Sequence, residues 1–227
     1  MTSHSRATTQ SLEQLLTHGE SALDAGKTKT AVQTLTKAVS LEPKSVTAHF
    51  YLALAYLKLG DLQNADKHAR QVTQLSPQEP NAYLNLGVIR IKQGRTFAAE
   101  RCYKQEIRLY PDCLEAHYNL GLLFLNQKKW RAAVTHLEKC WRNNHYAPDL
   151  AKDLAFAAQC AHRFDLEDEI YQSELRHNAR SVWALNNLAA LRNQQGRHEE
   201  ARALLNMAME ISPSDSMVRR NLRYTPQ

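Results

Sequence analysis

The chain has 227 residues, 43% of them hydrophobic, and a formal net charge of +6. This apolar share is typical of globular proteins and argues against general disorder. No run approaches the roughly 20 consecutive apolar residues of a membrane-spanning helix, so we expect no membrane span. Glycine and proline are scarce, with seven residues each. Together with abundant alanine and leucine, this scarcity favours helices over collagen-like or turn-rich all-β folds.

The amino-terminal segment is polar and lacks the apolar core of a secretory signal, so we expect a cytoplasmic protein. The four cysteines, Cys102, Cys113, Cys140 and Cys160, form no CxxC pair. Their spacing therefore indicates neither a zinc ribbon nor a redox dithiol, and we expect reduced thiols.

Six rows of 34 residues, beginning at Leu12, align along the chain without insertion or deletion. The rows are 12–45, 46–79, 80–113, 114–147, 148–181 and 182–215. We expect a polar tail at 1–11, and a capping helix and tail at 216–227. Three columns are the most regular: Ala31, Ala65, Ala99, Ala133, Glu167 and Ala201; Gly26, Gly60, Gly94, Lys128, His162 and Gly196; Pro43, Pro77, Pro111, His145, Ala179 and Pro213.

The third row shows what one repeat encodes. Apolar residues at helical spacing follow Asn81, and Gly94 then interrupts the pattern, as expected of the left-handed residue that ends a helix. A second helix carries Ala99 and Tyr103 on one face and stops before Pro111, because proline disfavours a helical residue ahead of it. Small residues in the alanine column let the two antiparallel helices approach closely. Each row is therefore predicted to be a helical hairpin.

With these landmarks the sequence resembles the tetratricopeptide repeat (TPR) family over about nine-tenths of its length. The residues that carry the resemblance are Leu86-Gly87, Tyr56, Ala99, Tyr103 and Pro111, and then Leu120-Gly121, Phe124, Ala133 and Leu137. The resemblance implies an all-α fold, a right-handed superhelical α-solenoid of stacked antiparallel hairpins. It also implies that the first helix of each hairpin lines a concave groove.

The fourth and fifth rows depart from the pattern. Lys128 and His162 occupy the glycine column, His145 replaces a proline, and Glu167 replaces an alanine. A glutamate at a close helix contact is unfavourable unless it turns to solvent or finds a partner. We therefore expect looser or re-angled packing in the fifth row, around Asn143 to Asp168.

Catalytic signatures such as GxGxxG, GxxxxGK[ST], GxSxG and HExxH do not occur. His49 and His117 share one repeat column, which favours a packing role over metal ligation. The acidic run Asp165 to Glu169 suits the first turn of a helix, where it complements the helix dipole. We therefore expect no enzyme activity, no cofactor and no metal site.

The first helices of rows two to four are apolar almost all round, and an apolar strip on a surface typically marks a binding groove. We expect an adaptor or chaperone-like protein that binds an extended peptide or an amphipathic helix of another protein. The predicted groove residues are Phe50, Tyr51, Leu54, Lys58, Leu84, Asn85, Val88, Lys92, Tyr118, Asn119, Leu122, Asn126, Asp153, Asn187 and Asn221.

Within this set, Asn85, Asn119, Asp153, Asn187 and Asn221 form one column. By the family resemblance, asparagines here hydrogen-bond the main chain of an extended ligand, and an amide can both donate and accept. The alternative interpretation is that these side chains cap or bridge neighbouring helices.

Other interpretations of the apolar strip are internal packing, cover by residues 1–11, and burial in a homodimer. By the family resemblance, a carboxylate clamp for chaperone tails needs two lysines, an arginine and asparagines at set positions of three successive rows. These positions hold Leu16, Glu20, Tyr51, Asn81 and Asn85, or, one row on, Phe50, Leu54, Asn85, Glu115 and Asn119. The basic residues are missing, so we expect no such clamp. Residues 80–147 carry the whole positive excess, with 11 basic and 5 acidic groups. RNA binding through this region is the alternative function, although weak aromatic interleaving disfavours it.

Overall fold

The computed structural model describes residues 3–145, 147 and 149–226, with the backbone alone described for residues 3–10. These residues form thirteen α-helices and no strand. The all-α fold of stacked helical hairpins is therefore confirmed. The chain divides into two compact units, which we call unit 1 (Met1–Leu123) and unit 2 (Phe124–Gln227).

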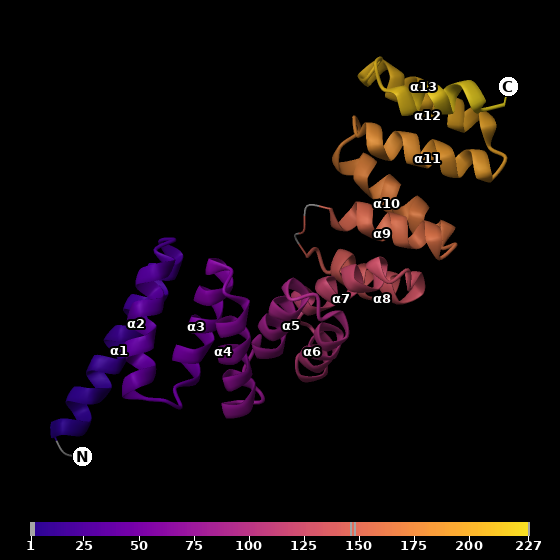
Figure 1. Ribbon diagram of the computed structural model, residues 1–227. Helices are drawn as coiled ribbons and strands as arrows, with labels where there is room; N and C mark the ends of the chain where they lie inside the picture. Colours follow the sequence, from indigo (N-terminus) through magenta and orange to yellow (C-terminus); the bar gives the residue numbers. More distant parts are fainter. Residues whose placement is uncertain (1–2, 146, 148, 227) are drawn as a thin grey trace. The chain divides into compact units, whose positions relative to one another are not determined.

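Unit 1 contains three helical hairpins and ends within a seventh helix (Figure 1). Each hairpin packs its own two helices together, and the first helices also contact one another, α1 with α3 and α3 with α5. Residues 3–11, expected as a tail, belong to the first helix. The helices are α1 (Ser3–Asp24), α2 (Thr28–Leu41), α3 (Val46–Leu59), α4 (Leu62–Leu75), α5 (Ala82–Lys92), α6 (Thr96–Leu109) and α7 (Leu114–Asn126).

Unit 2 continues the same hairpin pattern and ends in the predicted capping helix. Its helices beyond α7 are α8 (Trp130–Arg142), α9 (Leu150–Cys160), α10 (Phe164–His177), α11 (Val182–Gln194), α12 (His198–Ile211) and α13 (Ser216–Tyr224). Val218 of α13 is 1% exposed and joins a core with Leu185, Ala189 and Leu205 of the preceding hairpin. The capping helix therefore buries the apolar face that the last repeat would otherwise leave open.

The alanine column is buried in both units. Ala31, Ala65, Ala99, Ala133 and Ala201 are all fully buried. The facing first helices are equally tight, since a Cβ on Gly87 would lie 2.4 Å from the ring of Tyr103. These small residues set the distance between paired helices.

The glycine column adopts the same left-handed turn in every row. Gly26, Gly60, Gly94 and Gly196 have φ angles of 71° to 79°. Lys128 and His162, which replace glycine, have φ angles of 57° and 58°. Packing of the flanking helices therefore imposes the turn even where the side chain opposes it, at a cost of about 1 kcal/mol per residue.

Lys128→Gly and His162→Gly should each stabilise unit 2, by about 0.5 kcal/mol, because relief of backbone strain exceeds the added entropy of the unfolded chain. Urea denaturation followed by circular dichroism measures the change. The matched control is Ala161→Gly, next to His162, because Ala161 itself has a helical φ of −88°. This variant should lose stability. A loss of stability in all three variants would contradict the strain at the turn.

The amino terminus of α5 is capped from a distance by Glu106 of α6. Its side chain is fully buried. One oxygen accepts from the Asn81 N–H at 2.7 Å, and the other accepts from the Tyr83 and Leu84 N–H groups at 3.1 Å each. Three of the four N–H groups that a helix start leaves unpaired thus meet one carboxylate, which also complements the helix dipole.

Glu106→Gln should lower the free energy of unfolding of unit 1 by about 2 kcal/mol, because an amide offers one acceptor oxygen and turns an NH₂ group toward backbone donors. Chemical denaturation of the full chain tests this. Glu42→Gln, at an exposed position in unit 1, is the control and should match the wild type. Equal stability of both variants would mean that the cap contributes nothing.

Candidate functional site

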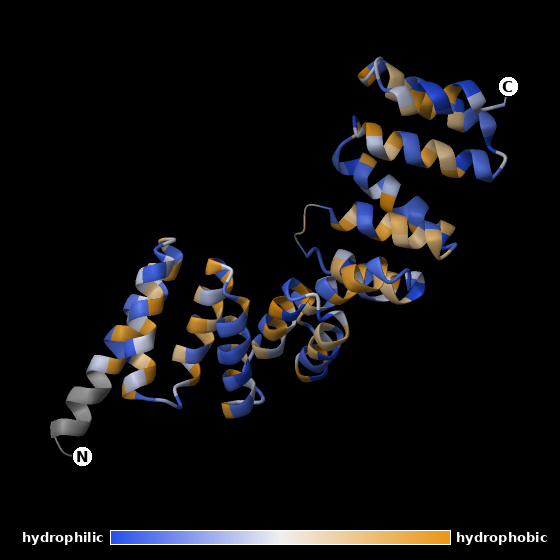
Figure 2. Ribbon diagram, in the orientation of Figure 1, coloured by the Kyte–Doolittle hydropathy of each residue, from blue (hydrophilic) through white to orange (hydrophobic). Residues whose placement is uncertain are grey.

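The candidate residues of unit 1 lie on three successive first helices, α3, α5 and α7. Figure 2 shows α3 mostly in the hydrophobic colours, whereas the middle of its partner α4 is hydrophilic. Most of the side chains are half-buried, Leu84 is buried, and the two lysines are exposed. We call this set the first-helix face: Phe50, Tyr51, Leu54, Lys58, Leu84, Asn85, Val88, Lys92, Tyr118, Asn119 and Leu122.

Two polar groups of the first-helix face are engaged with α1. The Tyr51 hydroxyl donates to the Glu20 carboxylate, and Lys58 Nζ donates to the Leu23 carbonyl at 3.3 Å. Burial, reinforced by the bond to Glu20, raises the pKa of Tyr51 to about 12. The ring of Phe50 packs edge-on against Tyr51, with centroids 5.8 Å apart. These contacts fix α3 against α1 and hold the aromatic rings in place.

The asparagine column divides between the two units. In the described part of the chain, the side-chain amides of Asn85 and Asn119 form no hydrogen bond. In unit 2, Asn187 donates to the Trp183 carbonyl at 2.6 Å, and Asn221 donates to Asn186 at 2.8 Å. Amides available to a ligand occur in unit 1, and amides that hold their own helices occur in unit 2.

The remaining predicted groove residues also lie in unit 2. Asn126 is exposed at the end of α7, and Asp153 is half-buried on α9. The first-helix face thus falls within unit 1. Unit 2 contains Asn126, Asp153, Asn187 and Asn221.

The basic residues of the middle rows are partly neutralised. Lys104 lies 2.7 Å from Glu100 on α6. Arg142 contacts Glu138 at 2.8 Å and Glu169 at 3.0 Å in unit 2. This pairing lowers the pKa of Glu169. The local field of these rows is therefore weaker than the sequence charge suggests.

The histidines of the packing column form hydrogen bonds to the loops that connect one hairpin to the next. His49 and His117 place Nε2 at 3.1 and 3.0 Å from the carbonyls of Pro43 and Pro111. His49 Nδ1 also lies 2.8 Å from His68 Nδ1. Burial, together with His49, lowers the pKa of His68 to about 4. Among the described residues, no group of three or more histidine, cysteine or acidic side chains could hold a metal ion.

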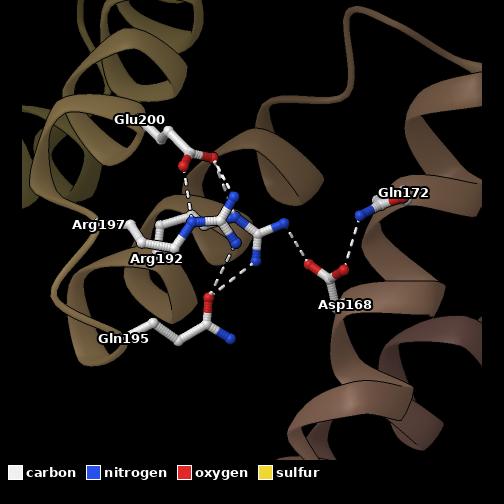
Figure 3. Close-up of polar contacts among 6 residues, drawn as sticks. All are labelled: Asp168, Gln172, Arg192, Gln195, Arg197 and Glu200. Atoms are coloured by element: carbon white, nitrogen blue, oxygen red, sulfur yellow. Dashed lines mark hydrogen bonds and ion pairs between the residues drawn. The ribbon is translucent and has the colours of Figure 1, made fainter.

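An ion-pair network that the sequence analysis missed joins α10, α11 and α12 (Figure 3). Arg192, only 6% exposed, lies 2.5 Å from Asp168 and 3.5 Å from Glu200. It also donates to Gln195 at 3.1 Å. The signal was present in the repeat, because Asp66 and Arg90 occupy the same two columns three rows earlier and lie 3.7 Å apart.

The glutamate that replaces an alanine in the fifth row is buried. Glu167 is 2% exposed, and it accepts from the Tyr171 hydroxyl at 3.2 Å. Its other oxygen has no hydrogen-bond partner among the described residues. Burial raises the pKa of Glu167, against the smaller effect of the Tyr171 hydrogen bond.

A cavity of about 700 Å³ also lies in this region, lined by Trp141, His145, Leu150 and Ile170 among others. The cavity fits looser packing around Asn143 to Asp168. Residues 146 and 148 of that range lie outside the described part of the chain. Looser packing therefore stays a prediction.

Glu167→Gln should stabilise unit 2 at neutral pH and flatten its pH dependence. Because the folded-state pKa is raised, the folded chain binds more protons and loses stability as pH rises from about 4.5. Glutamine keeps the acceptor for Tyr171 and has no charge to bury. Denaturation of the wild type and the variant at acidic and at neutral pH measures the free energy of unfolding. The difference between the two proteins contains no histidine contribution, because both have the same histidines. Glu199→Gln, at an exposed site, is the control. An unchanged pH profile in Glu167→Gln would show that burial of this carboxyl has no effect on stability.

One family model described as tetratricopeptide repeat matches residues 16–80 and 84–140, and a second model with the same description matches 182–206. The chain therefore belongs to the tetratricopeptide repeat family, with six repeats and a capping helix. Proteins of this family typically mediate protein–protein interactions and generally act as non-catalytic scaffolds. No curated protein matches the chain. No helix in the described residues combines the length and hydrophobicity that crossing a membrane requires.

Three solved structures illustrate the likeness. PilF of Pseudomonas aeruginosa is 21% identical, with a TM-score of 0.69 over 94% of this chain and 97% of that one. YrrB, described as a TPR protein with an unusual peptide-binding site, is 14% identical, with a TM-score of 0.71 over 83% and 97%. A TPR protein from Parabacteroides merdae is 16% identical, with a TM-score of 0.63 over 95% and 99%. At these identities the likeness concerns the fold.

Proposed function

We propose that this protein is a non-catalytic adaptor that binds an extended segment of a partner protein on the first-helix face of unit 1. The observation that carries the proposal is the combination of partly exposed apolar side chains with two unengaged amides, Asn85 and Asn119. An amide pair can satisfy the N–H and C=O of a ligand main chain. Apolar contacts at Val88 and Leu122 select its side chains.

The charge of the first-helix face indicates the composition of the segment. Lys92 is exposed at the end of α5, and Lys58 is held near the same face by its bond to the Leu23 carbonyl. A partner segment with apolar anchors and a few acidic residues suits this surface best. YrrB is a TPR protein described by its peptide-binding site, and it supports the view that the fold can take peptides.

The double variant Val88→Asp with Leu122→Asp should abolish binding of peptides selected from a displayed random library, because each aspartate places a charge in the apolar contact. The control is Leu41→Asp with Phe97→Asp, which makes the same change at two exposed apolar positions on second helices. It should bind as the wild type does. Circular dichroism verifies that both variants fold.

The two asparagines provide a finer test of main-chain recognition. Asn85→Ala with Asn119→Ala should lower the affinity for a selected peptide about tenfold, because one or two hydrogen bonds are lost. A peptide N-methylated at the peptide units that face these asparagines should bind the wild type more weakly than the unmethylated peptide does. The asparagine variant should bind both peptides equally.

Binding that survives the aspartate pair would rule out the first-helix face. Light scattering that finds a dimer in the wild type and a monomer in the aspartate pair would instead assign this face to a second copy.

A further inference from the structure

A cavity of about 570 Å³ lies in unit 1 and shares no lining residue with the first-helix face. Residues of α4, α5 and α6 line it, and three of them are arginines: Arg70, Arg90 and Arg101. The other polar lining groups include Thr73, Tyr83 and Gln105, and no carboxylate is among the lining residues. Every polar group named here can donate a hydrogen bond.

The repeat supplies an internal comparison for this cavity, because residue positions recur 102 residues later in unit 2. Arg90 corresponds to Arg192, whose charge is balanced by Asp168 and Glu200. At the position of Glu200, unit 1 has Ala98. At the position of Gln172, which donates to Asp168 at 2.6 Å, unit 1 has Arg70. Unit 1 therefore keeps the central arginine, lacks one carboxylate and gains a cation.

The apolar filling of unit 2 is also replaced. Leu175, Leu185 and Leu204 of unit 2 belong to or pack against a hydrophobic core. The equivalent residues in unit 1 are Thr73, Tyr83 and Cys102, all of which line the cavity. The same repeat position thus holds leucines that pack in a hydrophobic core in unit 2, and polar or sulfur-containing residues that line a cavity in unit 1.

The hydrogen bonds of Arg90 are incomplete. Its Nε atom is buried without a hydrogen-bond partner among the described residues, and so is Oδ1 of Asp66. Their separation of 3.7 Å is too long for a direct bond. Nη1 contacts the sulfur of Cys102 at 3.3 Å, a weak acceptor. Arg70 and Arg101 are exposed and form no ion pair in the described part of the chain.

We propose that this cavity binds the terminal phosphate group of a small-molecule ligand. Guanidinium groups recognise phosphate oxygens in pairs, and three of them line a space to which no carboxylate contributes. The one acid close to them, Asp66, lies 3.7 Å from Arg90 and is not among the lining residues. Arg90 is partly recessed, with 23% of its side chain exposed. A terminal phosphate can reach it, whereas the phosphodiesters of a nucleic acid track along exposed charges.

Titration of the full-length protein with inorganic phosphate and with pyrophosphate tests the proposal by calorimetry at low ionic strength. Arg70→Gln with Arg101→Gln should weaken pyrophosphate binding at least about tenfold. The control, Lys67→Gln with Arg108→Gln, removes the same charge from the same two helices at exposed positions that do not line the cavity. It should retain binding within about twofold.

A second readout needs no variant. The Nε–H resonance of Arg90 in the wild-type protein should shift on addition of pyrophosphate, because its buried donor lies beside the cavity. Binding of a single-stranded RNA oligonucleotide is measured as the alternative. Pyrophosphate binding lost equally in both double variants, RNA binding that pyrophosphate does not displace, or no pyrophosphate binding by the wild type would each overturn the proposal.

Discussion

The close approach of two helices within each hairpin is the constraint on which the rest of the structure depends. Buried alanines line the contact, and Gly87 leaves no room for a Cβ beside Tyr103. Because interiors pack densely, this distance sets where the next hairpin can lie and which side chains stay at its surface. The first-helix face of unit 1 and the arginine-lined cavity both lie on helices of these hairpins.

The repeat made much of the fold predictable. A 34-residue period with alanine and glycine columns leaves few alternatives to stacked hairpins. The period was less informative where a residue type changed. Lys128 and His162 look like breaks in the pattern, yet their backbones follow the glycines, because the flanking helices determine the turn. Glu167 looks like a residue that should avoid burial, and it is nevertheless buried.

The candidate site was predictable only in outline, because a side chain's availability depends on its neighbours in space. Asn85 and Asn187 are equivalent in sequence, yet Asn187 is bonded to its own helix. The same is true of charge. Arg90 and Arg192 share a column, and the difference between an open cavity and a closed ion-pair network lies in residues contributed by neighbouring helices. Comparing residues at equivalent positions three rows apart reveals arginines whose surroundings differ. Counting basic residues does not.

The cap formed by Glu106 also bears on how such arrays diversify. All three of its hydrogen bonds go to residues 22 to 25 positions earlier, inside the same repeat. The start of α5 therefore needs no residue from a neighbouring repeat to pair its N–H groups, whereas the apolar core around it is shared with α3 and α4. A repeat capped from within can be duplicated, deleted or moved within an array without leaving this helix start unpaired. In this respect the third row is suited to recombination, both in evolution and in engineered arrays of different length.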